Sequence, residues 1–232
     1  HMTSALRAIS SMATRQLLGE LLAAWRDTGG VTVDLESVGG VDAARRVAAG
    51  NESFDLVFLA SDAIERLIAS GHVDVESKTD WALSEVAVAV RKGAAHPDLS
   101  SEASLRAAVL SAESVGYSTG PSGTALMQLF ERWGIAEQLR SRLVQAPTGK
   151  PVGALVASGE VALGFQQLSE LIHLEGIEVL HPLPDGTRVT TVFSGAVVRG
   201  SSQTQEAKRL LAFLAAPQTA SIKQKQGMQQ PA

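Results

Sequence analysis

Residues 54–71 read FDLVFLASDAIERLIASG and hold one complete strand-and-helix unit. The apolar run at residues 56–59 predicts a buried strand. Ser61 and Asp62 can cap the helix that follows, and Gly71 can end it. A strand that passes directly into an amphipathic helix is the building block of an α/β fold.

The same alternation extends through the chain in both directions. Strands are predicted at residues 6–9, 31–35, 86–90, 115–117, 143–145, 161–165 and 190–198. Between them lie segments with apolar residues at helical spacing, the last of them at 206–214. This order favours an α/β fold with mostly parallel sheets and each helix packed on a sheet face.

Composition narrows the classes of function. The 232 residues are 45% hydrophobic and 19% charged, which is typical of a globular protein of one to two domains. There is no cysteine, so disulfides, thiolate nucleophiles and cysteine-bound metals are excluded. The net charge is −4 and basic residues do not cluster with aromatic ones, so we expect no nucleic-acid partner. No histidine pair has metal-ligand spacing, and we expect neither a metal nor a cofactor.

The compartment depends on the start of the chain. His1 and Met2 resemble the remnant of a tag, and the first strand follows almost at once, without the charged and apolar regions of a secretory signal. We therefore expect a periplasmic protein if a signal peptide was removed, and a cytoplasmic one otherwise. No apolar run approaches the roughly 18 residues that a membrane span requires.

Small, hydroxyl-rich or glycine-rich turns follow several predicted strands. They lie at residues 10–13, 38–40, 60–62, 118–124 and 148–151. In an open α/β sheet such turns place free N–H groups of helix N-termini at the carboxyl edge of the strands, where an anion can accept them. The alternative for each turn is an ordinary cap without a ligand.

Three further features add candidates. Lys150 is a cation on one of these turns and could pair with a carboxylate, or could be a solvated loop residue. Gln166 and Gln167 follow a buried strand, and because side chains alternate, only one should face a ligand. Residues 116–120 match the G-x-S-x-G nucleophile elbow, which would make Ser118 the nucleophile of a hydrolase, although Gly120 and Pro121 delay the helix that an elbow requires.

Taken together, residues 10–13, 39–50, 54–62, 117–123 and 159–166 resemble the type II periplasmic solute-binding proteins, and within them the molybdate-binding-protein-like branch. The resemblance covers residues 6–228. It implies two α/β lobes that close on a small ligand by hinge motion, lobe 1 at residues 3–83 plus 195–232 and lobe 2 at 84–194. The two crossing strands would lie near residues 83–85 and 192–194. It also implies a monomer that delivers its ligand to the membrane component of an ABC importer.

The resemblance places the ligand against Ser11, Gly40, the turn at 122–124, Val152 and Gln167. With the other residues of the turns, the expected ligand-binding set is Ser10, Ser11, Met12, Gly39, Gly40, Ser61, Ser118, Ser122, Gly123, Thr124, Lys150, Val152 and Gln167. Molybdate binders carry a hydroxyl residue where Gly40 or Val41 stands here and a tyrosine near Gln167. These departures favour a small organic carboxylate, with molybdate or another oxyanion as the alternative.

A second class of function shares this scaffold. Some proteins of this broad family resemble isomerases that act on unsaturated tricarboxylates such as aconitate. Such a reaction needs a side chain that moves a proton next to a carboxylate, and Ser10, Ser11 or a buried Lys150 would be the candidates. A binding protein needs no catalytic residue.

Overall fold

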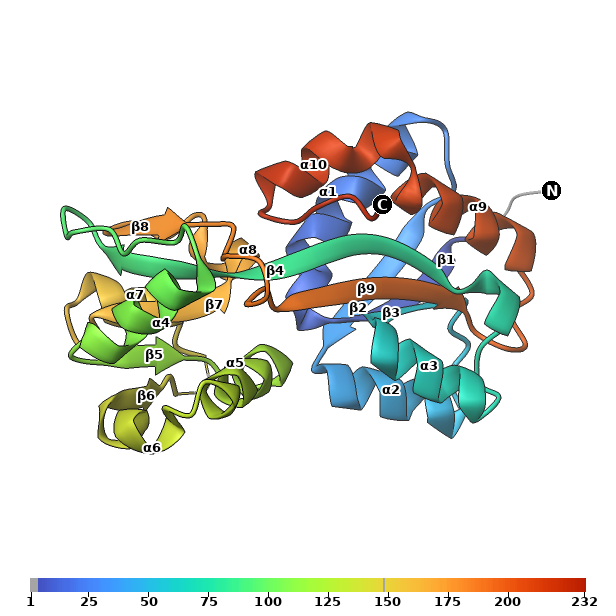
Figure 1. The fold of residues 1–232 in the computed structure, drawn as a ribbon. Helices are drawn as coiled ribbons and strands as arrows, with labels where there is room; N and C mark the ends of the chain where they lie inside the picture. The colour runs from blue at the N-terminus through green and yellow to red at the C-terminus, as the bar shows by residue number, and fades with distance from the viewer. Residues whose placement is uncertain (1–3, 148) are drawn as a thin grey trace. The chain divides into compact units, whose positions relative to one another are not determined.

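The computed structural model describes residues 4–147 and 149–232, and it confirms the predicted α/β class (Figure 1). The chain divides into two compact units. Unit 1 contains the described residues up to Leu83 together with Thr191–Ala232, and unit 2 contains Ser84–Thr190. Within the described residues, no helix combines the length and apolar character that a bilayer crossing requires.

Unit 1 is built around strands that lead directly into helices. Its elements are β1 (Leu6–Ser11), η1 (Met12–Thr14), α1 (Arg15–Asp27), β2 (Val33–Val38), α2 (Gly40–Ala49), β3 (Leu56–Ala60), α3 (Ser61–Ala69), η2 (Val75–Ser77), the first part of β4 (Thr79–Arg91), β9 (Thr190–Val197), α9 (Thr204–Ala215), η4 (Pro217–Thr219) and α10 (Ala220–Lys225). The strand order is β2-β1-β3-β9-β4. Strand β1 is parallel to β2 and β3, and β9 is antiparallel to β3.

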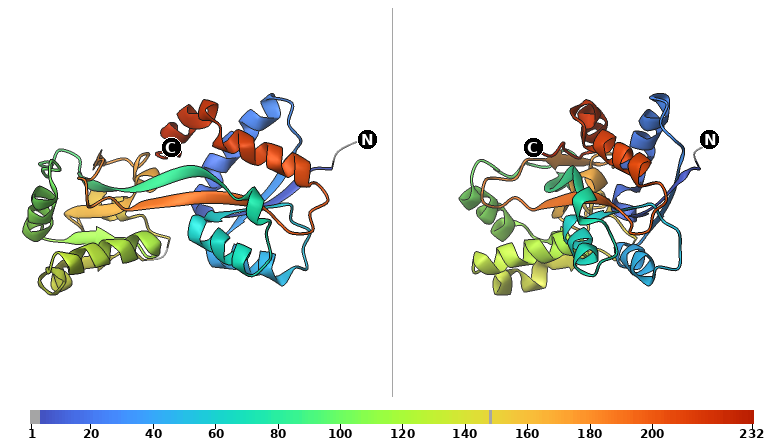
Figure 2. Two further views of the ribbon diagram at one scale, coloured as in Figure 1. Left: turned by 45° about the vertical axis from the view of Figure 1, so that its right-hand side comes forward. Right: turned by 90° about the vertical axis from the view of Figure 1, so that its right-hand side faces the viewer.

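Helices cover both faces of the unit 1 sheet. Leu6 and Phe58 face α1 and α9, whereas Ile9 and Val57 face α2 and α3. Since successive residues of a strand point to opposite faces, strands buried on both sides need continuous apolar runs. Helix α9 lies on the same side of this sheet as α1 in both views of Figure 2, although the two helices are far apart in the sequence.

Unit 2 repeats the plan. Its elements are the rest of β4, α4 (Glu102–Ser111), β5 (Val115–Tyr117), α5 (Pro121–Arg132), α6 (Ala136–Leu139), η3 (Arg140–Arg142), β6 (Leu143–Gln145), α7 (Val152–Ala157), β7 (Leu163–Gln167), α8 (Leu168–Leu171) and β8 (Ile177–Leu180). Strand β5 is parallel to β6 and β7, and β4 is antiparallel to β7 and β8. One core contains α4 and α5, and the other, on the opposite face, contains α7 and α8.

Four elements differ from the sequence-based expectation. Strand β4 begins at Thr79 instead of residue 86, because its polar residues Ser84 and Glu85 interrupt the apolar pattern. Strand β8 is half-buried and α8 is a single turn, so neither has a strong periodic signal. The helix at 206–214 is not the last one, since α10 follows; its buried face includes Lys223, which an apolar-periodicity reading misses.

Candidate functional site

The carboxyl ends of three adjacent parallel strands meet at one edge of unit 1. Ser11 at the end of β1 pairs in register with Val38 at the end of β2, and Ser10 pairs with Phe58 near the end of β3. Each strand then passes into helical residues at Met12, Gly40 or Ser61. The structure therefore brings together six residues of the expected set: Ser10, Ser11, Met12, Gly39, Gly40 and Ser61.

The beginning of α2 offers backbone donors at this edge. The amide of Ala43 is the one that starts the helical ladder, bonding the carbonyl of Gly39 at 2.9 Å. The N–H groups of Gly40, Val41 and Asp42 precede it and have no partner inside the helix. Gly39, the N-cap, has no side chain that could cap them. Such amides, supported by the helix dipole, can bind an anion.

The two neighbouring serines of β1 differ in their hydrogen bonds. Ser10 is fully buried, and its hydroxyl lies 2.8 Å from Ser37 Oγ and 2.9 Å from the carbonyl oxygen of Ser11. The hydroxyl oxygen of Ser11 is also buried but has no hydrogen-bond partner among the described residues. A Cβ added to Gly40 would lie 3.7 Å from Ser11 Cβ, so these two residues are neighbours. Ser10 therefore supports the sheet, while Ser11 is left to bond something else.

Acidic residues also occur in the first turns of α2 and α3. Asp42 pairs with Arg45 at 2.7 Å, and Asp62 pairs with Arg66 at 3.4 Å, in each case within the same helix. All four side chains are exposed, so solvent screens them and the arginines offset the carboxylates. The edge is therefore not dominated by negative charge.

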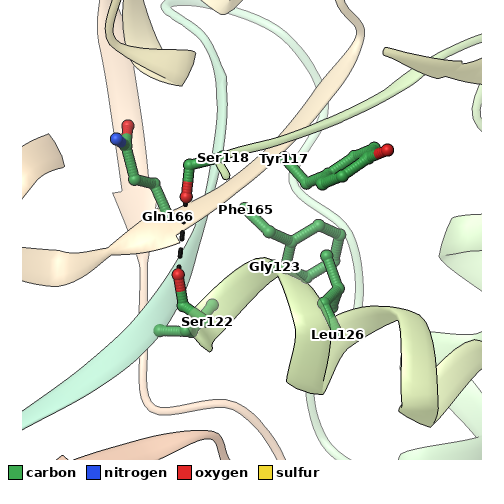
Figure 3. A pocket seen from close by; sticks show the side chains of 8 residues that line it. Tyr117, Ser118, Ser122, Gly123, Leu126, Phe165 and Gln166 are labelled. Carbon is green, nitrogen blue, oxygen red and sulfur yellow. Dashed lines mark hydrogen bonds between the residues drawn. The ribbon is translucent and has the colours of Figure 1, made fainter. Parts of the chain in front are cut away.

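In unit 2, residues from α5, β5 and β7 line a shallow hollow (Figure 3). Ser118 Oγ and Ser122 Oγ lie 3.4 Å apart, as the dashed line in Figure 3 marks. The lining residues are Val86, Tyr117, Ser118, Ser122, Gly123, Leu126, Phe165 and Gln166. Gly123 is required by close packing, because a Cβ there would lie 2.0 Å from the carbonyl oxygen of Ser118.

Gln166 connects this hollow to the start of α7. Its Oε1 accepts a hydrogen bond from the amide of Val152 at 2.9 Å, so that predicted ligand donor is already bonded in this structure. Gln166 also bonds Glu170; desolvation raises the pKa of the Glu170 carboxyl, and the bond from Gln166 partly opposes that shift. The side chain of Gln167 accepts from the Ser84 hydroxyl instead. The two glutamines therefore have separate partners on α7 and β4.

The remaining predicted residues of unit 2 lie apart from the hollow or are turned from it. The hydroxyl of Thr124 donates to the carbonyl of Gly120 at 3.2 Å within its own turn. Lys150 is half-exposed and pairs with Glu160 at 3.7 Å. Thr148, in the same predicted turn, lies outside the described residues. The structure thus groups Ser118, Ser122 and Gly123, joins Val152 to them through Gln166, and leaves Lys150 at the surface.

Ser118 lacks the surroundings of a hydrolase nucleophile. A nucleophile elbow holds its serine on a strained turn beside a base. Among the described residues, every positive φ belongs to a glycine, so Ser118 is not strained in this way. Its hydroxyl faces Ser122 and not a histidine.

Sequence reasoning missed several residues that shape these two edges. Ser37 fixes Ser10, Glu170 bonds Gln166, and Thr14, the fully buried N-cap of α1, has a hydroxyl without a partner among the described residues. The only available signal was the position of Ser37 and Thr14 near the ends of predicted elements, which many serines and threonines share.

The model of the family described as bacterial extracellular solute-binding protein matches residues 6–229. An aconitate isomerase from a Pseudomonas species is 34% identical over 228 residues, which are 96% of this chain and 87% of that protein.

Two solved structures are similar over almost the whole chain. One is a substrate-binding domain from Clostridium difficile named for a molybdenum ABC transporter, with a TM-score of 0.87, 14% identity, and coverage of 99% of this chain and 100% of the other. The other is the periplasmic molybdate-binding protein of Azotobacter vinelandii, with a TM-score of 0.71, 18% identity, and coverage of 98% and 100%. They confirm the predicted type II periplasmic-binding-protein fold; at these identities they do not identify a ligand.

Proposed function

The chain belongs to the bacterial extracellular solute-binding protein family, and from this premise we propose that its function is to capture a small organic carboxylate. The observation that carries the proposal is the Ser11 hydroxyl beside Gly40, which has no partner among the described residues, together with the first amides of α2, which have no partner inside that helix. A carboxylate oxygen can accept from both kinds of donor. Gly40 leaves room there for a ligand larger than a hydroxyl-bound oxyanion.

The choice of a carboxylate also rests on what the edge lacks. The resemblance implies a hydroxyl residue in the molybdate-binding branch where Gly40 or Val41 stands here, so a tetrahedral oxyanion would find fewer donors. We expect the carboxylate to be enclosed by the hinge closure that the family resemblance implies. Small-angle X-ray scattering with and without ligand would detect that closure as a smaller radius of gyration.

Calorimetric titration tests the ligand class. The panel is acetate, succinate, glutarate, tricarballylate, citrate, cis-aconitate and trans-aconitate, set against sulfate and molybdate. We expect at least one organic carboxylate to bind in the micromolar range and the inorganic oxyanions to bind at least 100-fold more weakly. Tight binding of sulfate or molybdate alone would overturn the proposal.

A second candidate function is the isomerisation of an aconitate-like tricarboxylate, because the aconitate isomerase is 34% identical over nearly the whole chain. Moving the double bond requires that one proton leave a CH₂ group beside a carboxylate and one proton return at the far carbon of the allylic unit. Ser10 and Lys150 are poor candidates, since Ser10 is bonded to Ser37 and Lys150 is exposed and ion-paired. Glu170, with its raised pKa beside Gln166, is a better acid–base candidate.

Incubation with cis-aconitate in D₂O separates the two functions. An isomerase would produce trans-aconitate with deuterium at the protonated carbon, visible by NMR. Glu170→Gln would then retain binding and lose at least 100-fold in turnover. Binding of cis-aconitate without any deuterium incorporation would exclude the isomerase function and support the solute-binding function.

The family name also bears on location and partner. Because the family is extracellular, we propose that the mature protein works in the periplasm and passes its ligand to an ABC importer. Fractionation of cells that express the natural gene would test this, and recovery in the cytoplasm would favour the isomerase function instead.

A further inference from the structure

Two exposed apolar side chains flank the anion-binding edge of unit 1. Met12 is 51% exposed and Val41 is 84% exposed, although most large apolar residues of the described chain are buried. Met12 directly follows Ser11, and Val41 directly follows Gly40. Since Ser11 and Gly40 are neighbours, each of the two apolar residues adjoins in sequence a residue of the proposed anion site, where the Ser11 hydroxyl has no partner among the described residues.

The geometry of a helix start directs Val41 toward this edge. Cα–Cβ bonds in a helix tilt toward its N-terminus, and Val41 is the second residue of α2. Its side chain therefore leans over the end that carries the free N–H groups. Met12 begins η1, and its unbranched side chain can adapt to the shape of a ligand.

Apolar neighbours discriminate between two kinds of anion. Sulfate and molybdate carry charge on every side, so an oxygen pressed against valine or methionine loses water without gaining a donor. An organic acid confines its charge to its carboxylate groups, and the CH₂ groups between them gain by contact with apolar surface. The same rim therefore opposes one class and favours the other.

We propose that Met12 and Val41 form an apolar rim around the Ser11–Gly40 anion site and select anions that carry a carbon skeleton over inorganic oxyanions. This inference rests on the proposed function, since it concerns the specificity of the same site. The occupant of the rim is the hydrocarbon part of the ligand.

The test is a comparison of chain lengths. Succinate, glutarate, adipate, sulfate and molybdate are titrated into the wild-type protein, Val41→Ser, Met12→Gln and the double variant. The three organic acids have two carboxylates each and differ only in the number of CH₂ groups, so in the wild type we expect affinity to rise with that number. In the double variant we expect the affinity for adipate to fall about tenfold and that for sulfate to stay the same or rise.

Val75→Ser is the matched control, because Val75 is also an exposed valine of unit 1, at 60%, but lies in η2. Its selectivity should equal that of the wild type, and thermal melts should show all variants folded. If the wild type binds none of the carboxylates, the proposed function itself fails. If it binds them and the double variant keeps the wild-type ratio of carboxylate to sulfate affinity, the proposed function stands and the apolar rim is wrong.

Discussion

The strand ends of unit 1 and unit 2 have the same construction but opposite hydrogen bonding. In both units parallel strands are followed by helices at one edge of a sheet, directly or after a short turn. In unit 1 the hydroxyl of Ser11 lacks a partner among the described residues. In unit 2 the Oγ atoms of Ser118 and Ser122 face each other, and Gln166 bonds the amide of Val152.

This difference shows that a fold supplies a place for an anion, while side chains decide whether that place is free. In unit 2 the hydroxyls of Ser118 and Ser122 face each other and Gln166 bonds the Val152 amide, so we expect these residues to contribute mainly to folding. At the unit 1 edge the Ser11 hydroxyl can still donate to a ligand. We therefore expect substitutions in unit 1 to affect ligand binding most and substitutions in unit 2 to affect stability most.

Gly40→Asp should produce the largest effect on binding. A carboxylate beside Ser11 would repel an anionic ligand and fill its space, so we expect carboxylate affinity to fall at least 1000-fold, about 4 kcal/mol. Folding should survive, because Gly40 lacks a positive φ and an added Cβ would meet only Ser11 Cβ at 3.7 Å. Calorimetry measures the carboxylate affinity, and a thermal melt measures whether the variant folds. Gly19→Asp, on α1 with no atom near the added Cβ, is the control. Retained binding in Gly40→Asp would show that the ligand binds at another place.

Gly123→Ala should be the most damaging change to stability in unit 2. The new Cβ would lie 2.0 Å from the Ser118 carbonyl oxygen, so the strand end or α5 must shift. We expect the free energy of unfolding to fall by about 3 kcal/mol in urea titrations. Gly19→Ala, with nothing near it in α1, should instead be stabilising by about 0.5–1 kcal/mol. Equal effects at the two glycines would contradict the close packing of unit 2.

The adjacent serines of β1 test the comparison within one strand. Ser11→Ala should weaken carboxylate binding about tenfold, roughly 1.4 kcal/mol, and leave stability unchanged, because its hydroxyl bonds nothing in the described chain. Ser10→Ala should lower the free energy of unfolding by about 1 kcal/mol, since Ser37 loses its partner, and should hardly affect binding. Calorimetry and urea titration of both variants decide; the reverse pattern would mean that Ser10 is the ligand contact.

Glu170→Gln should give the smallest change, which we expect in the pH dependence of the free energy of unfolding. Desolvation raises the pKa of Glu170 in the folded protein, so the unfolded chain releases this proton at lower pH. The wild type should therefore lose stability relative to Glu170→Gln as pH rises from the ordinary glutamate pKa through the raised one. Urea titrations from pH 4 to 8 measure the difference, with Glu175→Gln, which removes a carboxylate five residues further along the chain, as the control. A difference that stays constant with pH would show that Glu170 carries no such cost.

Elements that depend on local apolar spacing were predicted well from the sequence, and elements that depend on contacts between distant residues were not. Apolar periodicity predicted almost every long strand and helix, because each buries a face determined by local spacing. It missed β8, α8 and α10, which are short and weakly patterned. Lys223 shows why: it is fully buried and donates to the Leu214 carbonyl at 2.7 Å, a contact that no hydropathy pattern reports.

The candidate site was predictable in position and not in detail. Turns after strands placed Ser11, Gly40 and Ser122 at carboxyl edges, as the connectivity of parallel sheets requires. The choice between Gln166 and Gln167 could not be made, because the residues before them on both faces of β7 are buried and the alternation has no polar side. In the structure Gln166 lines the hollow and bonds the Val152 amide at the start of α7, whereas Gln167 bonds Ser84 on β4.

From its own residues the sequence determined the order of strands and helices and the places where helix starts follow strand ends, since both depend on neighbours a few positions apart. Only the tertiary structure decided which of the polar groups there are already bonded. Ser10 finds Ser37 and Val152 finds Gln166 across intervening elements, and such partners come within reach only when the sheets and helices have packed.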